Sequence, residues 1–83
     1  MVSIREHQYK IIDENVYLGL ELEVDGESFY KNSKVIVEFL KDGFVVKEDS
    51  SWVIPMLVGE GIFCLGREFK KEFDFDSIEV SFE

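Results

Sequence analysis

The stretch Val16-Tyr17-Leu18-Gly19-Leu20-Glu21-Leu22-Glu23-Val24 has the clearest pattern in the chain and decides its fold class. Aliphatic residues occupy every second position, and the positions between them hold Tyr, Gly and Glu. Successive side chains of a β-strand point to opposite faces of the sheet. Strict alternation over residues 16–24 therefore predicts a strand with one buried face and one wet, acidic face.

Asp25-Gly26 follows this strand directly. Asp-Gly is a favoured pair for a two-residue type I′ turn, so we predict a hairpin here, with Leu22 opposite Phe29 on the apolar face. In that register Tyr17 and Tyr30 lie on the face that also carries Glu21 and Glu23.

The segment Lys34–Lys41 is ambiguous, because Val35, Val37 and Phe39 alternate as in a strand while Ser33 and Gly43 could cap a helix. The β-branched residues at 35–37 and a second Asp-Gly pair at 42–43 favour a strand and a hairpin. That hairpin would pair Phe39 with Val46 and Lys41 with Phe44. A helix stays the alternative.

The remaining segments predict short elements separated by turns. The expected strands are Gln8–Ile12, Trp52–Val58 with Pro55 at a sheet edge or bulge, Ile62–Leu65 and Ile78–Phe82. Gly59–Gly61 is an expected turn, and Gly66 is expected to end the strand Ile62–Leu65. One or two helical turns are one interpretation of Arg67–Phe73, where Phe69 and Phe73 are four residues apart.

Composition supports the same fold class. The chain has no Ala and no Thr, whereas Val, Ile and aromatic residues, which favour strands, are plentiful. We predict a mainly β fold, in which residues 1–83 form a single compact acidic domain. Its architecture is a small antiparallel sheet or a partly closed barrel of five to seven short strands. An α+β fold with one short helix is the alternative.

The charge excludes some functions. The 83 residues include 9 basic and 18 acidic ones, giving a net charge of −9. Direct nucleic-acid binding is disfavoured, because its affinity comes mainly from Lys and Arg at phosphates.

No apolar run approaches the roughly 20 residues of a membrane span, and no signal peptide is visible. We expect a cytoplasmic protein of a bacterium or an infected host cell, with no membrane partner and with Cys64 buried as a small apolar residue.

The sequence offers little for catalysis. It has one histidine, His7, and one cysteine, and it lacks the glycine spacing of nucleotide-binding loops and the EF-hand pattern. We therefore predict no catalytic residues, no metal and no cofactor, and treat a small enzyme or metal binder as the weakest alternative.

The acidity instead suggests a protein partner with a basic surface. The candidate partner-binding residues are Tyr17, Glu21, Glu23 and Tyr30, with Asp74 and Asp76 as a second patch. We hypothesise an inhibitor of a basic, nucleic-acid-handling protein: an immunity protein against a nuclease toxin, or a phage-encoded inhibitor of a host polymerase, nuclease or defence effector. Nucleic-acid mimicry is compatible with the charge spacing without being implied by it. The alternative is a structural or assembly module, either a homo-oligomer or a small subunit of a larger complex.

Overall fold

A computed structural model describes residues 2–30, 34–54 and 57–82, with side chains in these ranges except those of residues 2, 25–30 and 57–59. The strands are β1 (Val2–Ile12), β2 (Asn15–Tyr30), β3 (Lys34–Lys41), β4 (Phe44–Val53), β5 (Leu57–Lys70) and β6 (Ser77–Phe82). The described part contains no helix, so the mainly β prediction is confirmed and the α+β alternative is wrong. No helix in these ranges is long and apolar enough to cross a membrane.

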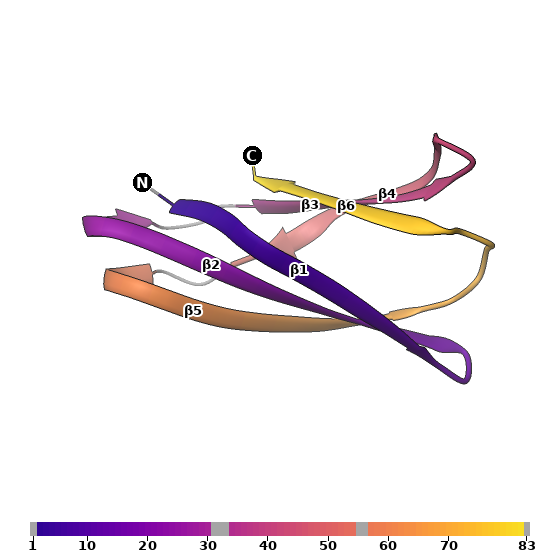
Figure 1. Cartoon of the computed structure of the whole chain (residues 1–83), viewed down its shortest axis with the longest axis horizontal. Coiled ribbons are helices and arrows are strands. Elements are labelled where there is room, and N and C mark those ends of the chain that lie inside the picture. Colours follow the sequence, from indigo (N-terminus) through magenta and orange to yellow (C-terminus); the bar gives the residue numbers. More distant parts are fainter. Residues whose placement is uncertain (1, 31–33, 55–56, 83) are drawn as a thin grey trace.

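The strands form two three-stranded sheets, ordered β1-β2-β5 and β4-β3-β6. Every paired neighbour is antiparallel. Figure 1 shows the sheets as two layers, with β2 central in one and β3 central in the other. Within the described ranges the sheets are not joined into a barrel.

The core lies between the layers and is built mainly from the two central strands. The aliphatic side chains of β2 predicted to point inward, at positions 16, 18, 20, 22 and 24, are each at most 2% exposed. From β3, Val35 and Val37 are fully buried and Phe39 is 2% exposed. The alternation of residues 16–24 therefore marks a strand with one buried face, as predicted.

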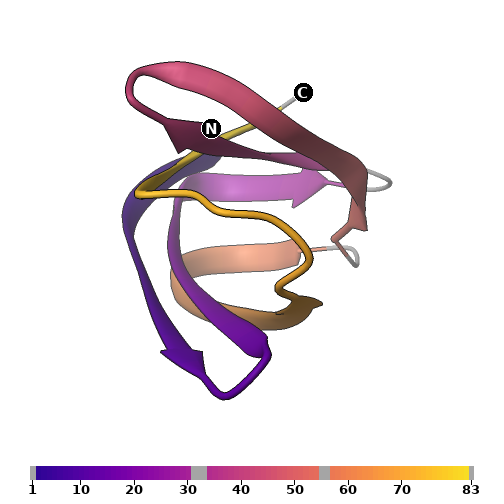
Figure 2. The same cartoon turned by 90° about the vertical axis from the view of Figure 1, so that its right-hand side faces the viewer.

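The loop Lys71–Asp76 crosses from β5 to β6 over one end of the interlayer space (Figure 2). It carries Phe73 and Phe75, whose ring centroids each lie 5.1 Å from that of Phe39. Phe69 at the end of β5 contacts the same ring edge-on at 5.4 Å. Edge-to-face packing of this kind adds to the burial of apolar area, so the loop closes the core at this end.

The Asp42-Gly43 hairpin is confirmed, and Lys34–Lys41 is a strand. Asp42 and Gly43 have φ of 52° and 84°, the positive values that a type I′ turn requires of both central residues. Lys41 pairs with Phe44 as predicted, but Phe39 pairs with Lys47 instead of Val46. A bulge between Phe39 and Leu40 shifts the register by one residue.

The Asp25-Gly26 hairpin is wrong, and so is the turn at Gly59–Gly61. Strand β2 continues through Tyr30, and β5 runs without interruption from Leu57 to Lys70. The two expected turns lie opposite one another: Val24 pairs with Gly61 and Ser28 with Gly59, so residues 25–27 oppose Glu60 alone. Residues suited to a turn here form a wide irregularity inside a long ladder, because pairing with a distant strand overrides the local preference.

Three further expectations are corrected. Arg67–Phe73 is not helical, since Arg67–Lys70 ends β5 and the phenylalanines of this segment are held by packing on Phe39. The expected strand Trp52–Val58 is divided between β4 and β5, and Pro55 lies outside the described residues. Cys64 is exposed, because it alternates with the inward-facing Phe63 and Leu65.

Candidate protein-binding face

The outer face of sheet β1-β2-β5 carries three of the residues that the sequence singles out. Directly paired residues of an antiparallel ladder point to the same side. The ladders therefore place on this face, side by side, the cross-strand rows Lys10-Tyr17-Glu68, Gln8-Gly19-Gly66, Glu6-Glu21-Cys64 and Ser3-Glu23-Ile62. We call this set the outer face.

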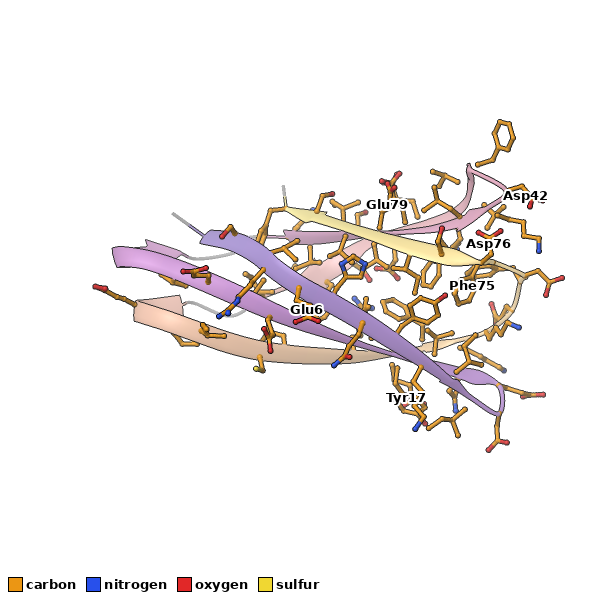
Figure 3. All side chains as sticks on the ribbon, in the orientation of Figure 1. Glu6, Tyr17, Asp42, Phe75, Asp76 and Glu79 are labelled. Carbon is orange, nitrogen blue, oxygen red and sulfur yellow. The ribbon has the colours of Figure 1, made fainter. Side chains whose placement is uncertain are left out.

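Tyr17, Glu21 and Glu23 all lie on the outer face. Along β2, Glu21 follows Tyr17 by four residues and Glu23 follows Glu21 by two. The Tyr17 side chain is 41% exposed, Glu23 is exposed and Glu21 is half-buried. Figure 3 shows Tyr17 projecting from the β1-β2-β5 sheet away from the other layer. The structure therefore places these three residues together on one face, as the alternation in the sequence predicts.

Tyr30 is not brought beside them. The hairpin that would have returned it next to Tyr17 is absent, and Tyr30 lies at the opposite end of β2, where it pairs with Leu57. Its side chain is outside the described residues.

Asp74 and Asp76 lie in the loop Lys71–Asp76, away from the outer face. The Asp76 backbone N–H donates to the Leu40 carbonyl at 2.8 Å, and its Oδ2 accepts from the Asp42 N–H at 3.1 Å. Both aspartates are exposed. Asp76 also supports the turn between β3 and β4 through these two hydrogen bonds. Figure 3 shows Asp42 and Asp76 together at this end.

Arg67, which the sequence did not single out, joins the two sheets on the β4/β5 side. Its Nη1 lies 3.5 Å from Asp49 Oδ1, and its Nη2 donates to Ser51 Oγ at 2.9 Å. The guanidinium carbon lies 5.0 Å from the Phe69 ring centroid and 5.9 Å from that of Trp52. Among the described residues, this is the one ion pair between opposite charges.

The same network sets the charge state of Asp49. Partial burial raises the pKa of this carboxyl, but hydrogen bonds from the hydroxyl and N–H of Ser51, with the charges of Arg67 and Lys47, outweigh it. The pKa is therefore held below its ordinary value of 3.8. The neighbours of Asp49 therefore stabilise its ionised form, in which it pairs with Arg67.

His7, the only histidine, also has a structural contact. Its Nε2 lies 3.0 Å from the Ile78 carbonyl oxygen, so Nε2 carries the proton and donates it across the β1/β6 side. Tyr9 donates its hydroxyl to the Asp76 carbonyl at 3.2 Å on the same side. In the described ranges no three His, Cys, Asp or Glu side chains gather as a metal site would require.

The outer face includes residues that sequence patterns alone did not identify. Glu6 lies directly opposite Glu21, and Gly66 lies directly opposite Gly19. Gly19 was visible as the one small residue on the wet side of its strand, whereas Gly66 was expected to end a strand. Both pairings depend on the register between strands, which alternation within one strand does not specify.

Comparison with known proteins finds no match: no protein-family model, no curated protein and no solved structure is significantly similar to the chain.

Proposed function

We propose that this chain is a cytoplasmic protein-binding domain that blocks a basic, nucleic-acid-handling protein through the outer face of sheet β1-β2-β5. The partner would be a nuclease toxin, or a polymerase, nuclease or defence effector of a host cell. The observation that carries the proposal is the row of Tyr17, Glu21 and Glu23 on one outward sheet face, with Tyr17 and Glu23 exposed, in a chain of net charge −9.

Two physical arguments support this assignment. Tyrosine is enriched at protein interfaces because it brings large contact area with one polar atom. Carboxylates beside it attract a basic surface at long range and raise the association rate. The inward side chains of the same strand are buried, so the outer face is free to contact a partner without disturbing the core.

The test is capture from a lysate of the source organism, followed by association kinetics with the purified partner. The variant is Glu21→Lys with Glu23→Lys. Its matched control is Glu38→Lys with Glu79→Lys, which changes the same charge on the opposite face of the molecule, where these two residues are directly paired.

We expect the wild-type chain and the control to capture a basic, nucleic-acid-handling protein and to inhibit its activity. The Glu21/Glu23 variant should associate about tenfold more slowly at low salt, with a smaller difference at high salt. Equal association rates for the variant and the control would exclude the outer face as the partner-binding surface. Failure to capture any basic protein would overturn the function.

One observation favours the second candidate, an assembly module. Phe44 is 76% exposed, and Val45 and Val46 are 50% and 47% exposed, all at the start of the edge strand β4. An apolar edge strand can pair with a strand of another chain. Light scattering at high concentration tests the homo-oligomer: a mass of 9.7 kDa, that of one chain, would exclude it.

A further inference from the structure

Two glycines face one another in the middle of the outer face. Gly19 of β2 pairs directly with Gly66 of β5, and neither has a side chain to cover the sheet. The result is an open hollow of about 670 Å³ above the two backbones. Its rim includes Lys10, Tyr17 and Glu68. A smaller hollow of about 150 Å³ adjoins it at Glu6, Glu21 and Cys64.

The backbone does not require glycine at either position. Neither residue has the positive φ seen at Gly43 and Gly61. A Cβ on Gly19 would lie 3.9 Å from the Gln8 carbonyl oxygen, and one on Gly66 would lie 3.7 Å from that of Leu18, both ordinary contact distances. Glycine inside a strand weakens the sheet, and one reason to find it there is close approach of a ligand or another chain.

The chemistry around the hollow is different at its two ends. At the end where the smaller hollow adjoins, Glu6 and Glu21 are directly opposite, so their Cβ atoms are about 4.5–5.5 Å apart, and like charges in this arrangement destabilise a sheet. Neither has an ion-pair partner among the described residues. At the other end Tyr17 stands between Lys10 and Glu68, whose opposite charges leave that row with no net charge.

An arginine side chain matches this arrangement. Its aliphatic stem suits a floor of glycine backbone beside the Tyr17 ring. Its planar guanidinium offers several donors at once and can bridge two carboxylates, whereas an ammonium acts as a single point charge. The two facing carboxylates of Glu6 and Glu21 make their end of the hollow the more negative one, which places the guanidinium there.

We propose that the Gly19–Gly66 hollow receives an arginine side chain of the basic partner, with its guanidinium held between Glu6 and Glu21. This inference rests on the proposed function and specifies what the outer face recognises.

The test uses acetylated penta-arginine and penta-lysine peptides titrated into the ¹⁵N-labelled full chain, with the amide signals of Gly19 and Gly66 as the readout. Gly66→Val fills the hollow without changing charge, and Gly66→Ala does so with less bulk. Glu21→Gln removes one of the facing charges. The matched controls on the opposite sheet are Ser81→Val and Glu38→Gln, both outward positions.

We expect penta-arginine to shift both glycine amides and to bind more tightly than penta-lysine. Glu21→Gln removes one charge-assisted contact and should weaken penta-arginine binding about tenfold. Gly66→Val removes the room for the arginine stem and should weaken binding by a similar factor. The controls should bind like the wild type. Because valine favours strands and glycine weakens them, Gly66→Val should also raise the thermal midpoint of unfolding while it weakens binding.

Several results would overturn the inference. Equal affinity for the two peptides would indicate charge attraction alone. Unchanged binding by both Gly66 variants, or shifts confined to the other sheet, would show that the hollow is not the site. A lower thermal midpoint for Gly66→Ala would mean that the fold itself needs this glycine.

The failure of this inference is separable from that of the proposed function. If the peptides do not bind in the hollow but Glu21→Lys with Glu23→Lys still slows capture of a basic partner, only the arginine site is wrong. If penta-arginine binds in the hollow and no basic partner is captured, the site stands and the inhibitory function is wrong.

Discussion

Arg67 of β5 and His7 of β1 both join the two sheets, but they do so on opposite sides of the core and with different chemistry. On the β4/β5 side, a charged guanidinium reaches Asp49 and Ser51 and lies over two aromatic rings. On the β1/β6 side, His7 and Tyr9 donate to backbone carbonyls of Ile78 and Asp76. One side therefore depends on side-chain charge, while the other depends on neutral acceptors that no substitution can remove.

The comparison shows how two open sheets are held against one another although they do not close into a barrel. Contacts on the β4/β5 side should weaken with salt and with acid, since screening and protonation act on charges. Contacts on the β1/β6 side should be insensitive to salt. Substitutions on each side can test this contrast.

The largest effect is expected for Arg67→Ala. It removes an ion pair, a hydrogen bond and two cation–π contacts, and the half-exposed setting limits the loss in unfolding free energy to about 2 kcal/mol. Urea denaturation measures it, with an unchanged m-value showing that the fold is retained. Arg67→Lys keeps the charge and should recover only part of the loss, because an ammonium lacks the planar fork. Full recovery would show that charge alone matters on this side.

Asp49→Asn should reduce stability by about 1 kcal/mol at neutral pH, since it leaves the contacts of Ser51 but loses the charge that Arg67 faces. The folded-state pKa of Asp49 is lowered, so its stabilisation is present above pH 4 and is lost as the pH falls through that pKa. Wild type and variant should therefore converge in a series of urea titrations as the pH falls through that pKa. A difference that persists undiminished in acid would contradict the assigned role.

His7→Ala tests the opposite side and should lower the unfolding free energy by about 1 kcal/mol, because it leaves the partly buried Ile78 carbonyl without this donor. The loss should be the same in 1 M salt as in dilute buffer. The loss for Arg67→Ala, measured in parallel, should shrink. Equal salt sensitivity of the two losses would remove the distinction between the sides.

Tyr9→Phe should have the smallest effect, about 0.5 kcal/mol. It removes an exposed hydrogen bond to Asp76 and keeps the ring, which packs on Phe75 at 5.6 Å between centroids. Tyr9→Ala removes that packing as well and serves as the reference for a larger loss. Thermal denaturation of the two variants separates the hydroxyl from the ring.

Much of the fold could be predicted because its signals are local. Alternation within residues 16–24 specifies a strand and its buried side, and Asp42-Gly43 specifies a turn. The same dipeptide at 25–26 does not turn, because β2 pairs with the distant strand β5 on both sides of it, over residues 15–24 and again over residues 28–30. The dipeptide alone does not distinguish these two cases.

The candidate site also has one part that the sequence predicts and one part that it does not. Tyr17, Glu21 and Glu23 share a face because they share a strand, so their side of the sheet follows from alternation. The opposition of Glu6 to Glu21 and of Gly66 to Gly19 depends on the register between strands, and in β1 on a bulge between Ile4 and Glu6. Such registers are set by the packed core as a whole, and a single sequence contains no direct signal for them.

The β2–β5 ladder has a consequence for how the chain reaches its fold. It pairs Asn15 with Lys70, so its strands meet only after a long loop has closed, and β-topologies of this kind fold slowly. Meanwhile residues 25–26 and 59–61 retain their tendency to turn and can form short-lived local hairpins that the mature ladder must dissolve. We expect refolding to be slow for so short a chain, and replacing Gly26 with a residue that resists a type I′ turn should make it faster.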